Sequence, residues 1–163
     1  MAKSINNIHA YSLEEANNLK EASFDVITLW HVMEHIHALH PQIDLFNKWL
    51  KPNGKLIVAV PNIESHDADF YGKYWGALDV PRHIYHFSPS CIQQLVAQHA
   101  LTLIATHPLY LDAYFISLIS EWNKGTNKLL AYVKAVWRGF MSNFHAKKDG
   151  NYSSLIYVFE KKA

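Results

Sequence analysis

The apolar positions of the chain change from a strand-like run to helical periodicity and back within residues 24–61. Phe24–Trp30, with the sequence FDVITLW, is a nearly continuous apolar run rich in β-branched residues, which predicts a central strand buried on both faces. Residues 55–60 repeat this pattern after the turn signal Pro52-Asn53-Gly54. Between the two runs, Pro41 stands in the first turn of a helix whose apolar side consists of Ile43, Leu45, Phe46, Trp49 and Leu50. Strand, helix and strand at this spacing predict one right-handed βαβ crossover.

The rest of the chain predicts further elements of a single α/β domain over residues 1–163. Near the N-terminus, Ser12 and Glu15 form a capping-box signature for a short helix. The later elements are expected to be a helix from Ser88 to about His99, a strand at 101–106, helices at 111–122 and 128–144, and a strand at 152–159. We therefore expect a mostly parallel sheet with an antiparallel C-terminal strand that forms a hairpin with the strand before it, and a helical insertion at 108–145.

One long segment, residues 62–87, shows no clear period. Its sequence, NIESHDADFYGKYWGALDVPRHIYHF, is dense in aromatic residues, histidine, aspartate and glycine. A long stretch without a regular pattern inside a compact domain is usually a functional lid or binding loop. We interpret residues 62–87 as a lid over a substrate.

Composition and charge narrow the class of protein. The net charge of +1 gives no electrostatic reason to expect a nucleic-acid partner. The single cysteine excludes an internal disulfide, which favours a reducing, cytoplasmic setting. The longest apolar window, residues 109–122, is too short for a membrane span. These features favour a small-molecule partner.

Titratable residues follow the first predicted strand directly, in the sequence HVMEH. In open α/β sheets ligands bind outside the carboxyl ends of the strands, so His31, Glu34 and His35 are expected at the site. If this stretch is helical, His31 and His35 share one face. The pattern H-x-x-E-H is also used by one class of zinc proteases, which leaves a metalloprotease as a less favoured alternative. The preferred interpretation assigns no metal ligand.

Four stretches occur here in a specific order and spacing: Ser12-Leu13-Glu14-Glu15, FDVITLWHVMEHI, LKPNGKLIVAVPN and DVPRHIYHFSP. The closing NYSSLIYVFEKK adds to them. Together they resemble the C-terminal two-thirds of the class I S-adenosylmethionine-dependent methyltransferases, in the subgroup of ubiquinone-type and polysaccharide-linked enzymes. The resemblance implies a partial Rossmann-like methyltransferase fold. It further implies methyl transfer from S-adenosylmethionine to a small-molecule or lipid- or sugar-linked acceptor.

The resemblance also implies which residues contact the cofactor. Ser12 and Leu13 match positions near the adenine, although Ser12 is equally well explained as a helix N-cap. The end of the strand matches the stretch under the ribose and the sulfonium, where Trp30 offers an aromatic face to a cation unless it packs in the core. The implied cofactor residues are Ser12, Leu13, Leu29, Trp30, His31 and Val32.

The candidate acceptor residues come mainly from the lid segment. A histidine with a near-neutral pKa suits removal of a proton from an oxygen or nitrogen acceptor, and His83 is the first candidate, with His35 and His86 as further catalytic candidates. Arg82 would anchor an acidic group. Tyr71, Tyr74 and Trp75 are expected to form an aromatic wall over the acceptor, although such residues are as often buried. Tyr85 is a further substrate-binding candidate. Hydrogen bonding that merely holds the loop together is the alternative for the polar members.

The chain departs from the family pattern in one respect. The glycine-rich turn that takes the methionine end of the cofactor should lie upstream of Ser12, but no glycine precedes Gly54. We therefore expect a truncated domain whose binding of S-adenosylmethionine on its own is in doubt. The alternative function is a non-catalytic binding module that dimerises through the sheet edge exposed by the truncation.

Overall fold

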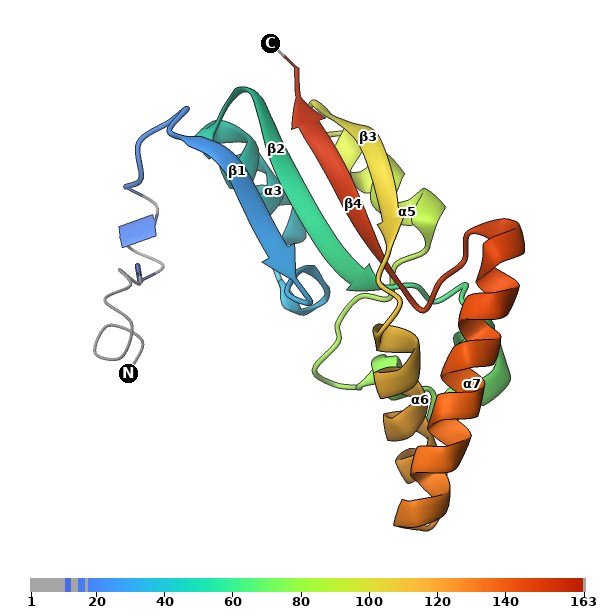
Figure 1. The fold of residues 1–163 in the computed structure, drawn as a ribbon. Coiled ribbons are helices and arrows are strands. Elements are labelled where there is room, and N and C mark those ends of the chain that lie inside the picture. Colours follow the sequence, from blue (N-terminus) through green and yellow to red (C-terminus); the bar gives the residue numbers. More distant parts are fainter. Residues whose placement is uncertain (1–10, 13–14, 17, 163) are drawn as a thin grey trace.

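A four-stranded mixed sheet forms the centre of the molecule (Figure 1). The computed structural model describes residues 11–12, 15–16 and 18–162. The strands are β1 (Phe24–Trp30), β2 (Leu50–Pro61), β3 (Leu101–Pro108) and β4 (Ser154–Lys161), in the order β1-β2-β4-β3. β1 and β2 are parallel, and β4 is antiparallel to both β2 and β3, so three of the four strands point the same way. The predicted α/β class and the antiparallel last strand are confirmed.

Two helices cover one face of this sheet, α3 (Leu39–Trp49) and α5 (Pro89–Ala97) (Figure 1). Their apolar residues pack on the inward side chains of the strands, and the core includes Ile43, Leu56, Ile92 and Phe159. Both helices were expected from sequence, and α5 begins as predicted, because Ser88 Oγ accepts a hydrogen bond from the Cys91 N–H at 3.2 Å.

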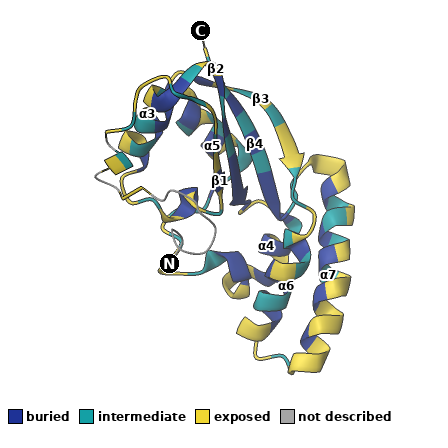
Figure 2. Ribbon diagram, turned by 60° about the vertical axis from the view of Figure 1, so that its left-hand side comes forward, coloured by how far each residue is buried: buried dark blue, intermediate teal, exposed yellow. Residues whose placement is uncertain are grey.

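The prediction that Phe24–Trp30 is a central strand buried on both faces is wrong. Among the residues that the structure describes, β1 is an edge strand that pairs only with β2. Leu29 faces the core, whereas Val26 and Trp30, on the opposite face, are 47% and 51% exposed. No described helix packs on that face of the sheet (Figures 1 and 2). A nearly continuous apolar run therefore does not reveal whether a strand is buried on one face of the sheet or on both.

The turn signal Pro52-Asn53-Gly54 lies inside a strand instead of before one. β2 begins at Leu50, immediately after α3, and Asn53 takes a left-handed φ of 62°. The pairing with β1 shifts register at this point, between Phe24 and Val26. The turn residues therefore form an irregularity in a longer strand, and the regular pairing begins at Lys55, where the sequence had predicted the strand.

Residues 62–87 are more regular than their sequence suggested. They contain the helix α4 (His66–Tyr71) and the 3-10 turns η2 (Gly72–Tyr74) and η3 (Gly76–Leu78). Ser65 caps α4 by accepting the Ala68 N–H at 3.2 Å. A six-residue helix is too short to show a period, which is why the pattern missed it. The lid role of this segment remains a prediction.

Two long helices leave the sheet at the carboxyl ends of its parallel strands (Figure 1). They are α6 (Asp112–Asn123) and α7 (Lys128–Asp149), which pack against each other. Close packing requires Gly139, because a Cβ there would lie 2.6 Å from Tyr114 Cδ1. The two helices predicted at 111–122 and 128–144 are thus present, with α7 five residues longer than expected. It also separates β3 from β4, which pair as antiparallel neighbours without a tight hairpin turn.

The predicted capping box is present near the N-terminus. The Ser12 N–H donates to Glu15 Oε2 at 2.7 Å, and the Glu15 N–H donates to Ser12 Oγ at 3.2 Å. The candidate residue Leu13 lies outside the described residues. Within the described part of the chain, no helix combines the length and the apolarity needed to cross a membrane.

Candidate functional site

The parallel direction of β1, β2 and β3 brings three segments to one edge of the sheet. His31 follows β1, Asn62 follows β2, and Asp112 begins α6 after β3. A cavity of about 350 Å³ lies there. Its polar wall includes His31, Asp79, Arg82, His83 and Asp112, and its apolar wall is the face of α6 with Phe115, Ile116 and Ile119.

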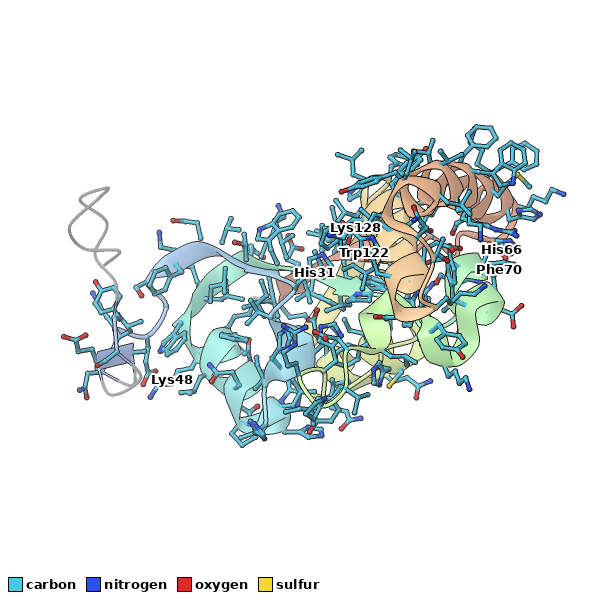
Figure 3. The ribbon with its side chains drawn as sticks, turned by 90° about the horizontal axis from the view of Figure 1, so that it is seen from below. His31, Lys48, His66, Phe70, Trp122 and Lys128 are labelled. Carbon is cyan, nitrogen blue, oxygen red and sulfur yellow. The ribbon has the colours of Figure 1, made fainter. Side chains whose placement is uncertain are left out.

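His31 turns the chain at the end of β1 and carries two ion pairs. Its φ is 51°, and its N–H donates to the Ala59 carbonyl at 2.9 Å. The ring lies between two carboxylates, with Nε2 at 2.9 Å from Asp112 Oδ2 and Nδ1 at 3.4 Å from Glu34 Oε1. Asp112 and then Glu34 raise the pKa of His31 to about 9, against the opposing effect of burial. His31 is therefore an imidazolium at neutral pH and links β1 to α6, where Figure 3 shows it between the sheet and the helices.

Glu34 is the most buried charged group of the site, with 1% of its surface exposed. It belongs to the 3-10 turn η1 (Met33–His35). Its carbonyl accepts the N–H groups of Ile84 and Tyr85 at 2.9 and 3.3 Å, which fastens η1 to the lid segment. Among the described residues, no group donates a hydrogen bond to either carboxylate oxygen. A buried carboxylate without donors favours a positive charge beside it.

The three candidate histidines of the site are held by backbone carbonyls. His83 Nδ1 lies 2.7 Å from the Ala77 carbonyl, His35 Nδ1 lies 2.9 Å from the Arg82 carbonyl, and His86 Nε2 lies 2.9 Å from the Leu78 carbonyl. Because a carbonyl only accepts, each of these nitrogens must donate a proton. In neutral His83 this leaves a lone pair on Nε2, which lies 4.0 Å from Glu34 Oε1 and 3.8 Å from Asp79 Oδ2. His83 is the candidate whose free nitrogen faces both the cavity and a carboxylate.

Glu34, His35 and His83 also form the one described group of side chains with ligand atoms close enough to hold a metal ion. Those atoms lie within 4.8 Å of one another. The two rings meet edge to face with centroids 4.7 Å apart, and both Nδ1 atoms are engaged by carbonyls, which leaves Nε2 for a ligand. This set differs from the H-x-x-E-H alternative. The expectation that His31 and His35 share a helix face is wrong, because η1 covers three residues only and His31 precedes it in a left-handed conformation.

The aromatic candidates lie away from the cavity. Trp75 is 2% exposed and donates its indole N–H to Asp67 Oδ2 at 2.9 Å. Tyr71 is also buried and donates its hydroxyl to Glu121 at 3.1 Å, and burial together with the Glu121 charge raises the pKa of Tyr71. Tyr85 stacks on Phe87 and points its hydroxyl at the His37 carbonyl. The apolar wall of this cavity is formed by α6, and the acceptor-binding role of Tyr71, Trp75 and Tyr85 stays a prediction.

The remaining candidates divide between the cavity and the surface of β1. Arg82 lines the cavity with an exposed guanidinium, whose Nε lies 3.1 Å from Asp79 Oδ1. Trp30 and Val32, the neighbours of His31 in sequence, are exposed, and Leu29 is buried on the helix-covered face. Ser12 has its hydroxyl engaged in the capping box.

Two features of the site escaped the sequence argument. Asp112 was not among the candidates from sequence, yet its Oδ2 lies 2.9 Å from His31 Nε2 at the cavity. Glu34 was expected at the site, but the only chemical role assigned to it was that of the carboxylate in the protease alternative. One signal pointed to Asp112: it is an acidic residue shortly after a strand that points the same way as β1, and such residues meet at the carboxyl edge of the sheet.

Comparisons with known proteins identify the family of the chain. A family model described as a methyltransferase domain matches residues 3–106, which is more than half of the chain. No curated protein sequence gives a significant match.

Solved structures give matches of low sequence identity. A SAM-dependent methyltransferase from Thermotoga maritima has 16% identity and a TM-score of 0.52 over 90% of this chain and 61% of that one. The cyclopropane synthase MmaA2 from Mycobacterium tuberculosis has 14% identity and a TM-score of 0.54 over 98% of this chain and 65% of that one. A Haemonchus contortus phosphoethanolamine N-methyltransferase 2 was solved with phosphomonomethylethanolamine and S-adenosylhomocysteine. It has 17% identity and a TM-score of 0.51 over 89% of this chain and 35% of that one. The chain thus spans less than two-thirds of each structure, and these similarities establish the fold.

Proposed function

The chain belongs to a methyltransferase domain family, and from this premise we propose that it transfers a methyl group from S-adenosylmethionine to an acceptor bound in the cavity beside α6. The observation that carries the proposal is the pairing of His83 with the buried Glu34 at the wall of that cavity, 4.0 Å apart. The cavity lies at the carboxyl ends of the parallel strands, where ligands bind in folds of this kind.

The cofactor side of the site is proposed at the end of β1. Trp30 is half exposed there, and its aromatic face is suited to the positive sulfonium of the methyl donor. Both ring nitrogens of His31 are already occupied by carboxylates, so its contribution to the cofactor side is the sharp turn of the backbone. Val32, Leu29, Ser12 and Leu13 complete the proposed cofactor residues.

The acceptor side is proposed at His83 and Arg82. Methyl transfer is an in-line displacement in which the acceptor oxygen or nitrogen bonds to the methyl carbon, the carbon–sulfur bond breaks, and S-adenosylhomocysteine leaves. The acceptor proton would pass to Nε2 of His83, and the resulting imidazolium would be stabilised by the Glu34 carboxylate. His35 and His86 act as positioning residues, because their N–H groups hold the carbonyls of Arg82 and Leu78 in the segment that leads to His83.

The walls of the cavity limit the acceptor class. About 350 Å³ accommodates a small molecule or the head of a larger one. One wall is apolar and the opposite one carries Arg82, which suits an acceptor with an apolar part and an acidic group. We therefore propose a small-molecule or lipid- or sugar-linked acceptor, in keeping with the ubiquinone-type and polysaccharide-linked subgroup.

A thermal-shift titration with S-adenosylmethionine and S-adenosylhomocysteine tests this function. A ligand that binds only the folded state raises the melting temperature in a concentration-dependent manner. We expect such a rise for the wild-type chain and a smaller one for Trp30→Ala. Val26→Ala is the matched control, because Val26 is similarly exposed on the same face of β1. Absence of any rise with either ligand contradicts the proposal for this chain.

The free edge of β1 favours a second candidate function, a non-catalytic module that dimerises. Among the described residues no strand pairs with the outer edge of β1, and an unpaired edge can accept a strand from another chain. Light scattering after gel filtration tests it. A dimer that Val26→Lys converts to a monomer, together with no response to the cofactor, supports this alternative over methyl transfer.

A further inference from the structure

The outward face of α7 is apolar although the face that packs on the protein is made of small residues. The packed residues are Ala131, Ala135, Gly139, Ser142 and Ala146. The large apolar side chains lie on the opposite side, and those that define the outer α7 surface are Leu129, Val133, Val136, Trp137, Phe140 and Phe144. All six are exposed, from 49% for Phe144 to 77% for Leu129, and Figure 2 shows this exposed side of the helix.

The outer α7 surface is one continuous stripe. Its residues follow one another at intervals of three, four and one, which places them on a single helical face. The stripe is about 22 Å long at the rise of an α-helix. Isolated exposed apolar residues are ordinary, but a contiguous apolar patch of this kind marks an interaction surface.

The charges around the stripe are positive. α7 contains five basic residues and one acidic residue, Asp149. Lys134 pairs with Glu121 at 3.6 Å, and the Arg138 guanidinium lies 3.6 Å from the ring centre of Phe70. Lys128 precedes the stripe and Lys147 and Lys148 follow it, and none of these three forms an ion pair with another residue that the structure describes. Free cations therefore stand at both ends of the apolar stripe.

We propose that the outer α7 surface binds the interface of an anionic lipid bilayer, with α7 lying flat on the membrane. A helix with tryptophan, phenylalanine and leucine on one face and lysines at its margins is the type that lies in the lipid headgroup region. The stripe is convex and consists of side chains that need no hydrogen-bonded partner beyond the Trp137 indole, which suits a deformable apolar layer. The helix does not cross the bilayer, because its other face is packed on α6.

The same charges disfavour a second copy of this chain as the occupant. Across a two-fold axis at the middle of the stripe, Lys128 of one copy would lie near Lys147 and Lys148 of the other. Like charges would meet at both ends of such a contact, whereas an anionic lipid surface attracts all of them.

Vesicle flotation tests the proposal directly. The folded full chain is mixed with vesicles of phosphatidylcholine alone or with about one quarter phosphatidylglycerol, where clustered lysines gain most from the anionic lipid. We expect binding to the anionic vesicles to be about tenfold stronger than to the neutral ones and to weaken with salt. The double substitution W137E/F140E should lower binding to the anionic vesicles by about tenfold or more, because it places negative charge on the face of α7 that would enter the lipid layer.

The matched control is V26E/I104E, which makes the same charge change at two apolar residues exposed on β1 and β3. It should bind like the wild type. Circular dichroism confirms that each variant is folded. A second variant, K147Q/K148Q, leaves the apolar stripe unchanged. Its binding should lose most of the preference for anionic over neutral vesicles.

Four outcomes overturn the proposal. They are no flotation of the folded wild type, equal binding to both vesicle types, unchanged binding of W137E/F140E, and a loss with V26E/I104E as large as with W137E/F140E. If gel filtration instead shows a dimer that W137E/F140E dissociates, without vesicle binding, the surface joins two copies of the chain.

Discussion

Nε2 of His83 lies 4.0 Å from Oε1 of Glu34, and the two residues come from segments nearly fifty positions apart. The other ring nitrogen of His83 is bound to the Ala77 carbonyl, so the free nitrogen points at the carboxylate. Glu34 in turn receives no hydrogen bond from a described residue. The relationship couples a potential base to a buried charge that would stabilise its protonated form.

Removal of the His83 nitrogen should impair the chemical step more than binding. We expect His83→Ala to lower the rate of methyl transfer by about 10²- to 10⁴-fold, the usual contribution of a general base. The thermal shift caused by S-adenosylhomocysteine should remain. His37→Gln, at an exposed histidine, serves as control and should retain activity. Full activity of His83→Ala would remove His83 from the mechanism.

The ion pairs of His31 predict a pH-dependent stability. Its pKa is about 9 in the folded protein and about 6.5 when unfolded, so folding favours the protonated ring. The stabilisation is fully present below pH 6.5 and is lost as the pH rises toward 9. Since 37% of the side chain is exposed, we expect a loss of about 1 kcal/mol for His31→Asn at pH 6.

Melting temperatures from pH 6 to pH 10 measure this effect. The difference between wild type and His31→Asn should shrink toward high pH, and asparagine is chosen because it tolerates the left-handed backbone of position 31. His37→Gln should follow the wild type throughout. A constant difference across the pH range would show that the charge of His31 does not contribute.

The buried carboxylate of Asp67 should be essential to the lid segment. It is 2% exposed and accepts hydrogen bonds from Trp75 Nε1 at 2.9 Å, Ser142 Oγ at 2.7 Å and Ser153 Oγ at 2.7 Å. Asp67→Asn replaces an acceptor by a donor that faces these donors. We expect a loss of about 2–3 kcal/mol in urea unfolding. Asp69→Asn, on the exposed side of the same helix, should change stability little, and equal losses for both would contradict the argument.

Gly139 should not tolerate a side chain, although alanine is the better helix former. A Cβ at this position would lie 2.6 Å from Tyr114 Cδ1 and 2.8 Å from Tyr114 Cα, and a backbone atom cannot rotate away. We expect Gly139→Ala to lower the free energy of unfolding by about 1–3 kcal/mol, because the steric clash exceeds the gain from the higher helix propensity of alanine. Val136→Ala on the exposed face provides the control for thermal unfolding. A stabilised Gly139→Ala variant would show that the two helices adjust freely.

The local pattern of the sequence was enough to predict most elements. The strands at β1 to β4, the helices α3, α5, α6 and α7, and the caps at Ser12 and Ser88 all follow from periodicity and from hydrogen bonds within a few residues. The order of strand, polar cluster and strand also predicted the edge of the sheet where the cavity lies. These features depend on neighbours in sequence, so the sequence alone determines them.

Contacts between distant segments decided the rest. Three features depend on which surfaces meet after folding: whether β1 is covered on one face or two, whether the Trp75 indole is exposed or buried against Asp67, and whether the large or the small side of α7 faces inward. His31 shows the same limit, because Asp112, which holds its charge, is 81 positions away in sequence and arrives through β3. The sequence by itself determined the elements and the edge at which their polar residues gather. Only the tertiary structure decided which of those residues meet, because that depends on how separately formed elements pack in space.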